Sequence, residues 1–364
     1  MSSVFNIHRS KYTYLIAIFL LIFATALFIF AFEQFPLENT SLAIDWYAIY
    51  PAIKGGTIHY GGSGLRNPPW AVLPVLPLGL LSFRASWGLL NLLTFAVLMV
   101  SVPRKSPRWL WLTGVILLVV SFPALRHAAD ANFEGLVIGG ILLLLSGYKK
   151  QNIWFTAIGF LLASGKIQET WLLLLVAGIF ILKTWDTRQW LQLAGVGGAI
   201  LGITGLWRGR EWWSDFTQIP QLGQGSLMDS SLLATFHRLG LPMWLFVIIW
   251  ILLAGTTLYI AVSGGTQLTR EKTGTLVAAS LLLAPYAAGN SFLTVLAIGI
   301  IPLLFTQPII ATILIILVDV PYFTLAHPTI MYHYGATYWT LLLFIAWGAM
   351  MLNVYQSKKD QAHH

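Results

Sequence analysis

The sequence of 364 residues contains no cysteine, and only 9% of its residues are charged. The absence of cysteine excludes a disulfide framework, so cysteine counting gives no information about the redox compartment. Soluble globular domains carry roughly 25% charged residues. The scarcity of charge therefore excludes a cytosolic enzyme, a nucleic-acid-binding module and a disordered protein. Because 57% of the residues are hydrophobic, we expect an all-α polytopic membrane protein.

Twelve apolar stretches are long enough, or nearly so, to cross a bilayer, which takes about 20 residues. They lie at residues 12–32, 86–102, 108–124, 133–148, 152–164, 169–183, 189–206, 242–263, 273–289, 291–305, 308–325 and 337–354. A thirteenth apolar segment, 70–82, is shorter and contains Pro74 and Pro77.

The basic residues decide whether segment 70–82 crosses the membrane. If it lies in the outer interface, the cluster that contains Arg104 and Arg108 falls inside, together with most of the 21 basic residues. This arrangement follows the positive-inside rule. We therefore predict about 12 transmembrane helices in the plasma membrane with both termini cytoplasmic, and a juxtamembrane helix at 70–82. The net charge of +8 then reflects membrane topology rather than binding to nucleic acid.

The acidic residues gather on the opposite, external side. Most of the 13 Asp and Glu residues fall there, in loops or at outer ends of the predicted spans. We expect a single transmembrane domain, 1–364, with two long external loops at 33–85 and 207–241. The polar chemistry should therefore lie on the external face.

The first external loop contains the most informative residues. Ser41 is placed to cap a helix that runs through Ile53, and Asp45 falls in its first turns. Trp46, Tyr47 and Tyr50 surround Asp45 with aromatic rings that can stack on sugars. An acid shielded in this way at the membrane surface is a candidate general base. The alternative is a solvated loop acid.

The second half of the loop holds the chain close to the membrane. Gly55 and Gly56 should end the first helix and begin a glycine-rich run. Asn67, followed by two prolines and Trp70, fixes a bend into segment 70–82.

This order of residues resembles glycosyltransferase family 87. The resemblance rests on Asp45-Trp46-Tyr47, then glycine and Tyr60, then Asn-Pro-Pro-Trp at 67–70 and Leu-Pro-Leu-Gly-Leu-Leu at 76–81. It implies the C-type glycosyltransferase fold, with two juxtamembrane helices in the first external loop. It also implies an inverting transfer of a hexose, mannose in the bacterial members, from a polyprenyl-phosphate donor to a lipid or glycan acceptor. The family's catalytic base corresponds to Asp45.

Four later turns resemble family motifs, each with a departure. Asn132 matches the end of a Gly-Gln-x-Asn turn, where Asp130 replaces Gln. Lys166 matches the Lys of a Lys-Pro-Gln turn, where Ile167 replaces Pro. The remaining two comprise Asp229-Ser-Ser-Leu followed by His237 and Arg238, and an Ala284-Pro-Tyr turn in which Asn290 stands where the family has His.

The resemblance and the external cations together suggest how the donor phosphate is bound. Arg binds two phosphate oxygens at once and Lys offers a compact charge. We expect Lys166, Arg238, Arg126 and His237 to hold the phosphate; ordinary contact with lipid headgroups is the alternative. Trp46, Tyr47, Tyr50, Asn67, Asn132 and Asn290 are expected to form the sugar and acceptor pocket.

No cofactor or metal centre is expected. The histidines lack the spacing of zinc ligands on one helix, although Glu38 with Asp45 leaves a divalent cation open. His327 and His333 could replace the family's missing His. Two alternative functions remain: a lipid or sugar-lipid transporter, suggested by the intramembrane Asp319, and a family member that binds the donor without turnover.

Overall fold

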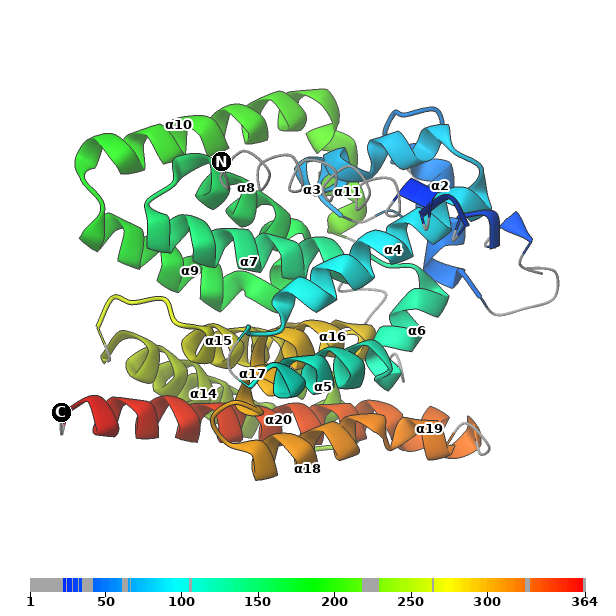
Figure 1. The fold of residues 1–364 in the computed structure, drawn as a ribbon. Helices are drawn as coiled ribbons and strands as arrows, with labels where there is room; N and C mark the ends of the chain where they lie inside the picture. The colour runs from blue at the N-terminus through cyan, green and yellow to red at the C-terminus, as the bar shows by residue number, and fades with distance from the viewer. Residues whose placement is uncertain are drawn as a thin grey trace, which may run out of the picture.

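The computed structural model describes residues 22–34 apart from 24, 28 and 32, and then 42–60, 65, 67–104, 107–217, 229–263, 265–324 and 328–362. Within these residues every regular element is a helix, and a single β-bridge joins Asp229 to Ala288. Most of the long helices run along one common direction and are stacked in layers (Figure 1). The expected all-α class is confirmed.

Most of the first half of the chain lies in the upper layers of Figure 1. In order, it contains α2 (Ile44–Ile53), α3 (Pro69–Val72), the 3₁₀-helix η1 (Leu73–Leu80), α4 (Phe83–Ser101), α5 (Arg108–Val119), α6 (Phe122–Asp130), α7 (Glu134–Lys150), α8 (Ile153–Ala163), the 3₁₀-turn η2 (Ser164–Lys166), α9 (Ile167–Thr184) and α10 (Thr187–Thr204). Of these elements, α5 lies among the lower helices.

The second half begins in the upper part of Figure 1, where its first two elements continue from α10, and then adds most of the lower layers. It contains the π-helical turn η3 (Gly205–Gly209), α11 (Arg210–Phe216), α13 (Leu232–Arg238), α14 (Met243–Ser263), α15 (Arg270–Leu283), η4 (Gly289–Ser291), α16 (Phe292–Val295), the π-helical η5 (Leu296–Ile300), α17 (Ile301–Leu303), α18 (Pro308–Asp319), α19 (Pro321–Thr324) and α20 (Pro328–Ala362).

The two ends of this bundle differ. At one end lie α2, α3, α6 and α11; at the other lie the C-terminal part of α20 and the connections from α7 to α8 and from α9 to α10 (Figure 1). We call them the Asp45 end and the Lys149 end. The helix α7 joins the two ends, since its 17 residues span about 24 Å at a rise of 1.5 Å per residue.

The helical stretch Ile153–Thr184 folds back on itself around α7. Gly147 of α7 approaches Thr156, and its neighbour Tyr148 contacts Thr184. In a straight helix Thr156 and Thr184 would lie about 42 Å apart, so the 3₁₀-turn η2 must reverse the chain. Lys166, at the end of η2, therefore lies at the Asp45 end, beside the first residue of α7.

Glycine allows α7 and α8 to pack closely. A Cβ atom added to Gly140 would lie 2.5 Å from the backbone nitrogen of Ala163, and one added to Gly159 would lie 2.4 Å from that of Leu144. Small residues that bring helix backbones together are typical of membrane interiors, where no hydrophobic effect drives helices to associate.

Five helices of the described residues are long and apolar enough to cross a membrane, or six if the bent pair α5 and α6 counts as one span. These five are Phe83–Ser101, Ile153–Thr184, Thr187–Asp215, Met243–Ser263 and Tyr334–Ser357. The structure therefore supports a polytopic membrane protein, but not the predicted number of twelve.

Breaks within two predicted spans account for part of the difference, and the count also takes Ile153–Thr184, which covers two predicted spans and reverses at η2, as one helix. The predicted span 108–124 bends by 48° between α5 and α6, where Ser121 caps α6 and Pro123 occupies its first turn. The predicted span 291–305 is divided among η4, α16, η5 and α17. The predicted span 12–32 lies largely outside the described residues.

The apolar surface of the bundle also indicates a membrane. Only 6% of the most apolar window of Thr187–Asp215, and 22% of that of Met243–Ser263, is buried within the protein. Ile203, Trp244 and Ile251 are more than half exposed. Such an apolar exterior is stable when lipid covers it.

Both helices expected in the first external loop are present, as α2 and as α3 with η1. The helix α2 begins at Ile44 after Ala43 and ends at Ile53, so the end expected from Gly55 and Gly56 is confirmed. Ser41, the expected cap, lies outside the described residues. Where η1 crosses α2, a Cβ atom on Gly79 would lie 1.9 Å from the carbonyl oxygen of Ile53, so only glycine fits there.

Candidate active site

Asp45 lies in the first turn of α2, and the start of that helix is tied to a distant element. Ala43, which precedes the helix with a φ of 56°, donates its backbone N–H to the carbonyl of Ala129 in α6. The position of Asp45 is therefore set by α2 and α6 together. Its side chain is half-buried.

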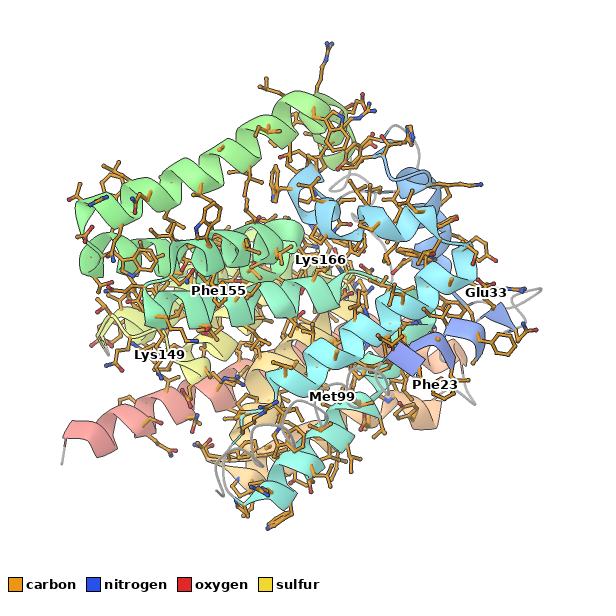
Figure 2. The ribbon with its side chains drawn as sticks, turned by 45° about the horizontal axis from the view of Figure 1, so that its top comes forward. Phe23, Glu33, Met99, Lys149, Phe155 and Lys166 are labelled. Carbon is orange, nitrogen blue, oxygen red and sulfur yellow. The ribbon has the colours of Figure 1, made fainter. Side chains whose placement is uncertain are left out.

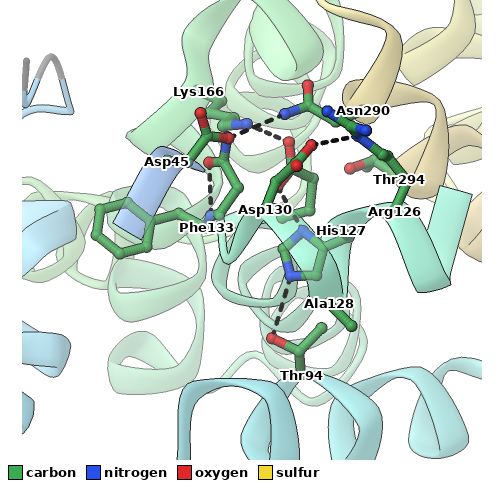
Figure 3. A network of polar contacts seen from close by, with 12 residues as sticks. Asp45, Thr94, Arg126, His127, Ala128, Asp130, Phe133, Lys166, Asn290 and Thr294 are labelled. Carbon is green, nitrogen blue, oxygen red and sulfur yellow. Dashed lines mark hydrogen bonds and ion pairs between the residues drawn. The ribbon is translucent and has the colours of Figure 1, made fainter. Parts of the chain in front are cut away.

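Two side-chain amides from distant parts of the sequence donate hydrogen bonds to the Asp45 carboxylate (Figure 3). Asn132 Nδ2 donates to Asp45 Oδ2 over 2.6 Å, and Asn290 Nδ2 donates to the same oxygen over 3.5 Å. The amide of Asn132 is itself oriented, because its Oδ1 accepts the backbone N–H of Phe133 at 2.6 Å. The structure thus brings together three of the predicted site residues.

Asn290 offers a further hydrogen-bonding group. Its Oδ1 is buried and has no hydrogen-bond partner among the described residues, and it sits on η4 beside the Asp45 carboxylate. Buried amide oxygens without a partner are uncommon, so this oxygen is available to a hydroxyl group of a bound sugar.

A buried network of charged groups lies beneath Asp45. The Lys166 ammonium pairs with Glu134, with which it is in direct contact, and with Glu169 at 3.7 Å. Glu169 also accepts a hydrogen bond of 2.7 Å from Thr294, and Glu134 contacts His127 Nδ1 at 2.9 Å. The network links the starts of α7 and α9 to α6 and α16 (Figure 3).

Burial raises the pKa of Asp45 above its usual value of 3.8. The positive charge of Lys166 and the hydrogen bond from Asn132 act in the opposite direction, and the Glu134 carboxylate adds to the increase. A carboxylate with a raised pKa is a stronger base than an exposed one, so the site can remove a proton from a hydroxyl group held at Asp45.

Lys166 is less available than the sequence suggested. Only 8% of the residue is exposed, and two carboxylates already surround its ammonium group. A donor phosphate would have to compete with Glu134 for this cation. Contact between Lys166 and phosphate therefore stays a prediction, while its pairing with Glu134 and Glu169 is a property of the fold.

Arg126 is the more accessible cation near Asp45. It pairs with Asp130 through a contact of 2.6 Å between Nε and Oδ2, and 48% of its side chain is exposed. Asp130 Oδ1 is buried without a hydrogen-bond partner among the described residues. The remaining nitrogens of the Arg126 guanidinium can therefore meet an anion at the surface.

The loop around Asn67 is fastened to the turn that contains Lys166. Asn67 Nδ2 donates to the carbonyl of Gly165 over 3.0 Å, and Trp70 Nε1 donates to Ser164 Oγ over 2.9 Å. Tyr60 in turn donates to the carbonyl of Asn67 over 2.7 Å. Asn67 thus holds the first loop against the turn that contains Lys166, and its side-chain amide supplies the hydrogen bond that does so.

The three aromatic residues after Asp45 have different environments. Trp46 is fully buried and donates its indole N–H to Ser86 Oγ over 3.0 Å, so it anchors α2 on α4 and does not face a sugar pocket. Tyr47 is 53% exposed. Tyr50 donates to the carbonyl of Leu81 over 2.7 Å. The sequence pattern could not distinguish these positions, because burial depends on where α4 packs.

Arg238 and His237 lie on α13, and no hydrogen bond among the described residues joins them to Asp45. Arg238 donates to the carbonyl of Asp229 over 2.7 Å and to Thr235 Oγ1 over 2.9 Å. Burial raises the pKa of Asp229, although its carboxylate accepts the backbone N–H groups of Ala287 and Ser231. His237 is exposed. Arg238 and Asp229 therefore support the turn that leads to Asn290, whereas the side chain of His237 does not contribute a hydrogen bond among the described residues.

Sequence reasoning treated Glu134 and Glu169 only as external acids and missed their role in the network. A signal was present: each begins an apolar stretch, where a buried acid needs a partner. Glu169 also follows Lys166 by three residues, the spacing of neighbours on a helix. His127, Thr94 and Thr294 carried no comparable signal.

Several other predicted groups do not enter the described site. Glu38 and His327 lie outside the described residues, as does the side chain of His333. Within the described part of the chain, no group of three or more His, Cys, Asp and Glu residues could hold a metal ion.

Asp319, which suggested a transporter, has a structural contact. Its Oδ1 accepts the backbone N–H of Phe122, at the start of α6, over 2.8 Å. Next to it, Tyr322 donates to the carbonyl of Val120 over 2.7 Å. An acid at a helix N-terminus satisfies groups that the helix leaves unpaired, and the observation that favoured a transporter is thereby accounted for.

Comparison with known proteins adds one match. The model of glycosyltransferase family 87 matches residues 66–288, which include Arg126, Asn132 and Lys166 but not Asp45 or Asn290. No curated protein and no solved structure matches the chain significantly. Since the family model covers more than half of the 364 residues, the chain belongs to glycosyltransferase family 87 and is a membrane glycosyltransferase.

Proposed function

We propose that the protein transfers a hexose, with mannose as the first candidate, from a polyprenyl-phosphate donor to a lipid or glycan acceptor. The reaction would take place at the external face of the plasma membrane. The observation that carries this proposal is the half-buried Asp45 carboxylate, held by Asn132 and Asn290, in a chain that belongs to a glycosyltransferase family.

In the proposed reaction Asp45 acts as the general base. It takes the proton of the acceptor hydroxyl while the acceptor oxygen forms a bond to the anomeric carbon. The bond from that carbon to the phosphate oxygen breaks, and the polyprenyl phosphate leaves with the electron pair. Attack opposite to the leaving group inverts the configuration at the anomeric carbon.

The two amides suit this role because both donate to Asp45 Oδ2. Oδ1 is then left to accept the hydroxyl proton. Asn132 also fixes the direction of the carboxylate, and a fixed base within hydrogen-bond reach of its proton is what general base catalysis requires. Asn290 would bind a sugar hydroxyl through its free Oδ1.

The phosphate of the donor would be met by cations at the Asp45 end. Arg126 is the first candidate, because its guanidinium is half-exposed beside the site. Lys166 would contribute its charge from below, and Arg238 and His237 would extend the cationic surface from α13. Charge develops on the phosphate as it leaves, so each cation stabilises the transition state as well as binding.

Exposed groups of the first loop would line the sugar and acceptor pocket. Tyr47 presents its ring at the surface, and Tyr50 packs beside it against Phe83 with ring centroids 5.3 Å apart. Asn67 shapes the pocket by holding the Gly165 turn, and Trp46 supports α2 from the core.

The proposal also includes the C-type fold and an orientation in which the site is external and both termini are cytoplasmic. Basic residues gather at the Lys149 end, in agreement with the positive-inside rule. They include Arg104, Lys149, Lys150, Lys183, Arg188, Arg270 and Lys272. Acids Asp45, Asp130, Glu134, Glu169, Glu211 and Asp215 lie at or near the opposite end.

The test is a transfer assay with purified protein in lipid. It supplies radiolabelled polyprenyl-phosphate mannose, polyprenyl-phosphate glucose or a nucleotide sugar, each with a panel of glycolipid acceptors. We expect label to move from a polyprenyl-phosphate sugar and not from the nucleotide sugar. Transfer from the nucleotide sugar alone would contradict the donor class, and binding of a lipid donor without transfer to any acceptor would support a member without turnover.

A further inference from the structure

The Lys149 end contains a second concavity, remote from Asp45. A cavity of about 860 Å³ lies between the ends of α4, α7 and α9 and the connection from α14 to α15. Its volume is within the range of about 300–1,000 Å³ that is usual for small-molecule sites. Lys149 and Lys166 mark the two ends of the surrounding helices in Figure 2, so this cavity is not part of the site around Asp45.

The charge of the cavity wall has one sign. Lys149 and Arg270 are among its lining residues, and the lining contains no Asp or Glu among the residues that the structure describes. Arg270 also lines an adjoining cavity of about 340 Å³, together with Arg104 and Glu271. Such a wall attracts an anion, and it favours one large enough to meet two cations.

A buried donor in the wall lacks a partner. Trp185 lines the cavity and is 5% exposed, and its indole Nε1–H has no hydrogen-bond partner among the described residues. A buried N–H without a partner is costly. An anionic oxygen within reach of Nε1 would satisfy it, and this unmet donor is a second and independent sign of a ligand.

One side of the remaining wall is apolar, and the rest carries uncharged polar side chains such as Ser146, Gln151 and Gln267. Val100, which is 59% exposed, lines the cavity together with Leu142 and Leu145. A free inorganic anion would leave the apolar side chains uncovered. A lipid contacts both parts of the wall, since its headgroup binds the cations while its first methylene groups cover the apolar side chains.

The wall is also held in place. Tyr148 donates to the carbonyl of Thr266 and contacts Thr184, which fastens the α14–α15 connection to the ends of α7 and α9. Lys272 donates to the carbonyl of Gly265 over 2.8 Å. Preformed walls lower the entropic cost of binding.

From these observations we infer that the cavity at the Lys149 end binds the phosphate headgroup of an anionic membrane phospholipid. Lys149 and Arg270 meet the phosphate, Trp185 donates its indole N–H to it, and Val100, Leu142 and Leu145 contact the start of the acyl chains. Basic pockets between membrane helices are a common form of headgroup site.

The chain supplies a matched pair of variants for the test. Lys149 and Lys150 are adjacent, both exposed and both in the last turn of α7, but only Lys149 lines the cavity. Native mass spectrometry of the full-length protein in detergent would count bound dioctanoyl phosphatidylglycerol. Dioctanoyl phosphatidylcholine and inorganic phosphate are the comparison ligands. The inference predicts that phosphatidylglycerol binds most tightly.

Lys149→Glu should weaken binding of phosphatidylglycerol about tenfold, because it removes a charge-assisted contact, whereas Lys150→Glu should change it less than about twofold. Trp185→Phe, which keeps the ring and removes the N–H, should weaken it in the same direction. Equal effects of Lys149→Glu and Lys150→Glu would show attraction to surface charge alone and overturn the inference. Equal affinity for phosphatidylcholine, or for inorganic phosphate, would overturn the lipid assignment.

Discussion

At the scale of single residues, the buried charged groups near Asp45 have defined partners. Lys166 is surrounded by Glu134 and Glu169, and Asp45 lies above them with two amide donors. A buried charge without a partner is very costly. The pairing below Asp45 thus fixes the floor of the site, and Asp45, whose hydrogen bonds from Asn132 and Asn290 both go to Oδ2, keeps Oδ1 for a substrate.

The pKa of Asp45 leads to a prediction for the pH dependence of transfer. A base must be deprotonated, so the acidic limb of kcat/KM should lie above the usual carboxyl pKa of 3.8, as the burial of Asp45 requires. The hydrogen bond from Asn132 favours the charged form. Asn132→Ala should therefore move the acidic limb to higher pH. If the acidic limb of kcat/KM does not move in Asn132→Ala, then Asn132 does not hydrogen-bond to the group that titrates.

Lys166 provides a test that separates a structural from a phosphate-binding role. Lys166→Met leaves Glu134 and Glu169 buried without their cation, and we expect it to destabilise the protein by about 3–5 kcal/mol. Lys166→Met combined with Glu134→Gln should recover part of that loss. Thermal unfolding measures both effects. An unchanged melting temperature with a raised KM for the donor would instead assign Lys166 to the phosphate.

At the scale of elements, the site depends on how short helices are held against long ones. The helix α2 carries Asp45, and it is fastened to α6 through Ala43 and to α4 through Trp46. The η1 helix crosses α2 at Gly79, whose backbone meets the end of α2 directly. A displacement of α2 would therefore move the base relative to Asn132 and Asn290.

Gly79→Ala tests this dependence. The added Cβ would lie 1.9 Å from the Ile53 carbonyl oxygen, and relief of the overlap requires η1 or α2 to shift. We expect a loss of about 1–3 kcal/mol in stability and a drop in kcat. Gly195→Ala in α10, where nothing lies within 4 Å of the added atom, is the control and should leave both quantities nearly unchanged. Equal behaviour of the two variants would contradict the close crossing.

The elements also show how far sequence reasoning extends. Apolar length located the helices after residue 83 and the two helices of the first loop, because hydrophobic pattern and glycine signals are local. It also located the reversal at Ser164–Lys166, between the predicted spans 152–164 and 169–183, but it could not locate the break between α5 and α6 within the predicted span 108–124. It grouped Asp45 with Asn132 and Asn290, but it placed Trp46 beside the sugar, since whether a Trp faces the core depends on the packing of α4.

At the scale of the whole molecule, one end of the bundle holds the candidate active site and most of the described acids, together with several cations, while the other end is basic and holds the second cavity. This polarity motivates the proposed orientation, in which the Asp45 end is external. The two sites are separated by the length of α7, about 24 Å. The donor reaction and the binding of a structural phospholipid can therefore be studied independently.

The absence of cysteine makes the orientation directly testable. Lys54→Cys, after α2, and Lys150→Cys, at the end of α7, each introduce a single thiol at an exposed position. In intact cells a membrane-impermeant maleimide should label the Lys54→Cys variant at once, and the Lys150→Cys variant only after permeabilisation. The reverse pattern would place the Asp45 end in the cytoplasm.

The central claim is that Asp45 removes the acceptor proton, and a single-turnover measurement with pre-bound donor tests it most directly. Asp45→Asn keeps the size of the side chain and removes the base, so donor binding should stay within about twofold while the rate of transfer falls by about 10²–10⁴-fold, the usual contribution of a general base. Glu211 of α11 is an exposed acid that pairs with Arg208. The control variant Glu211→Gln should therefore transfer at the wild-type rate. Transfer by Asp45→Asn at the wild-type rate would contradict the account.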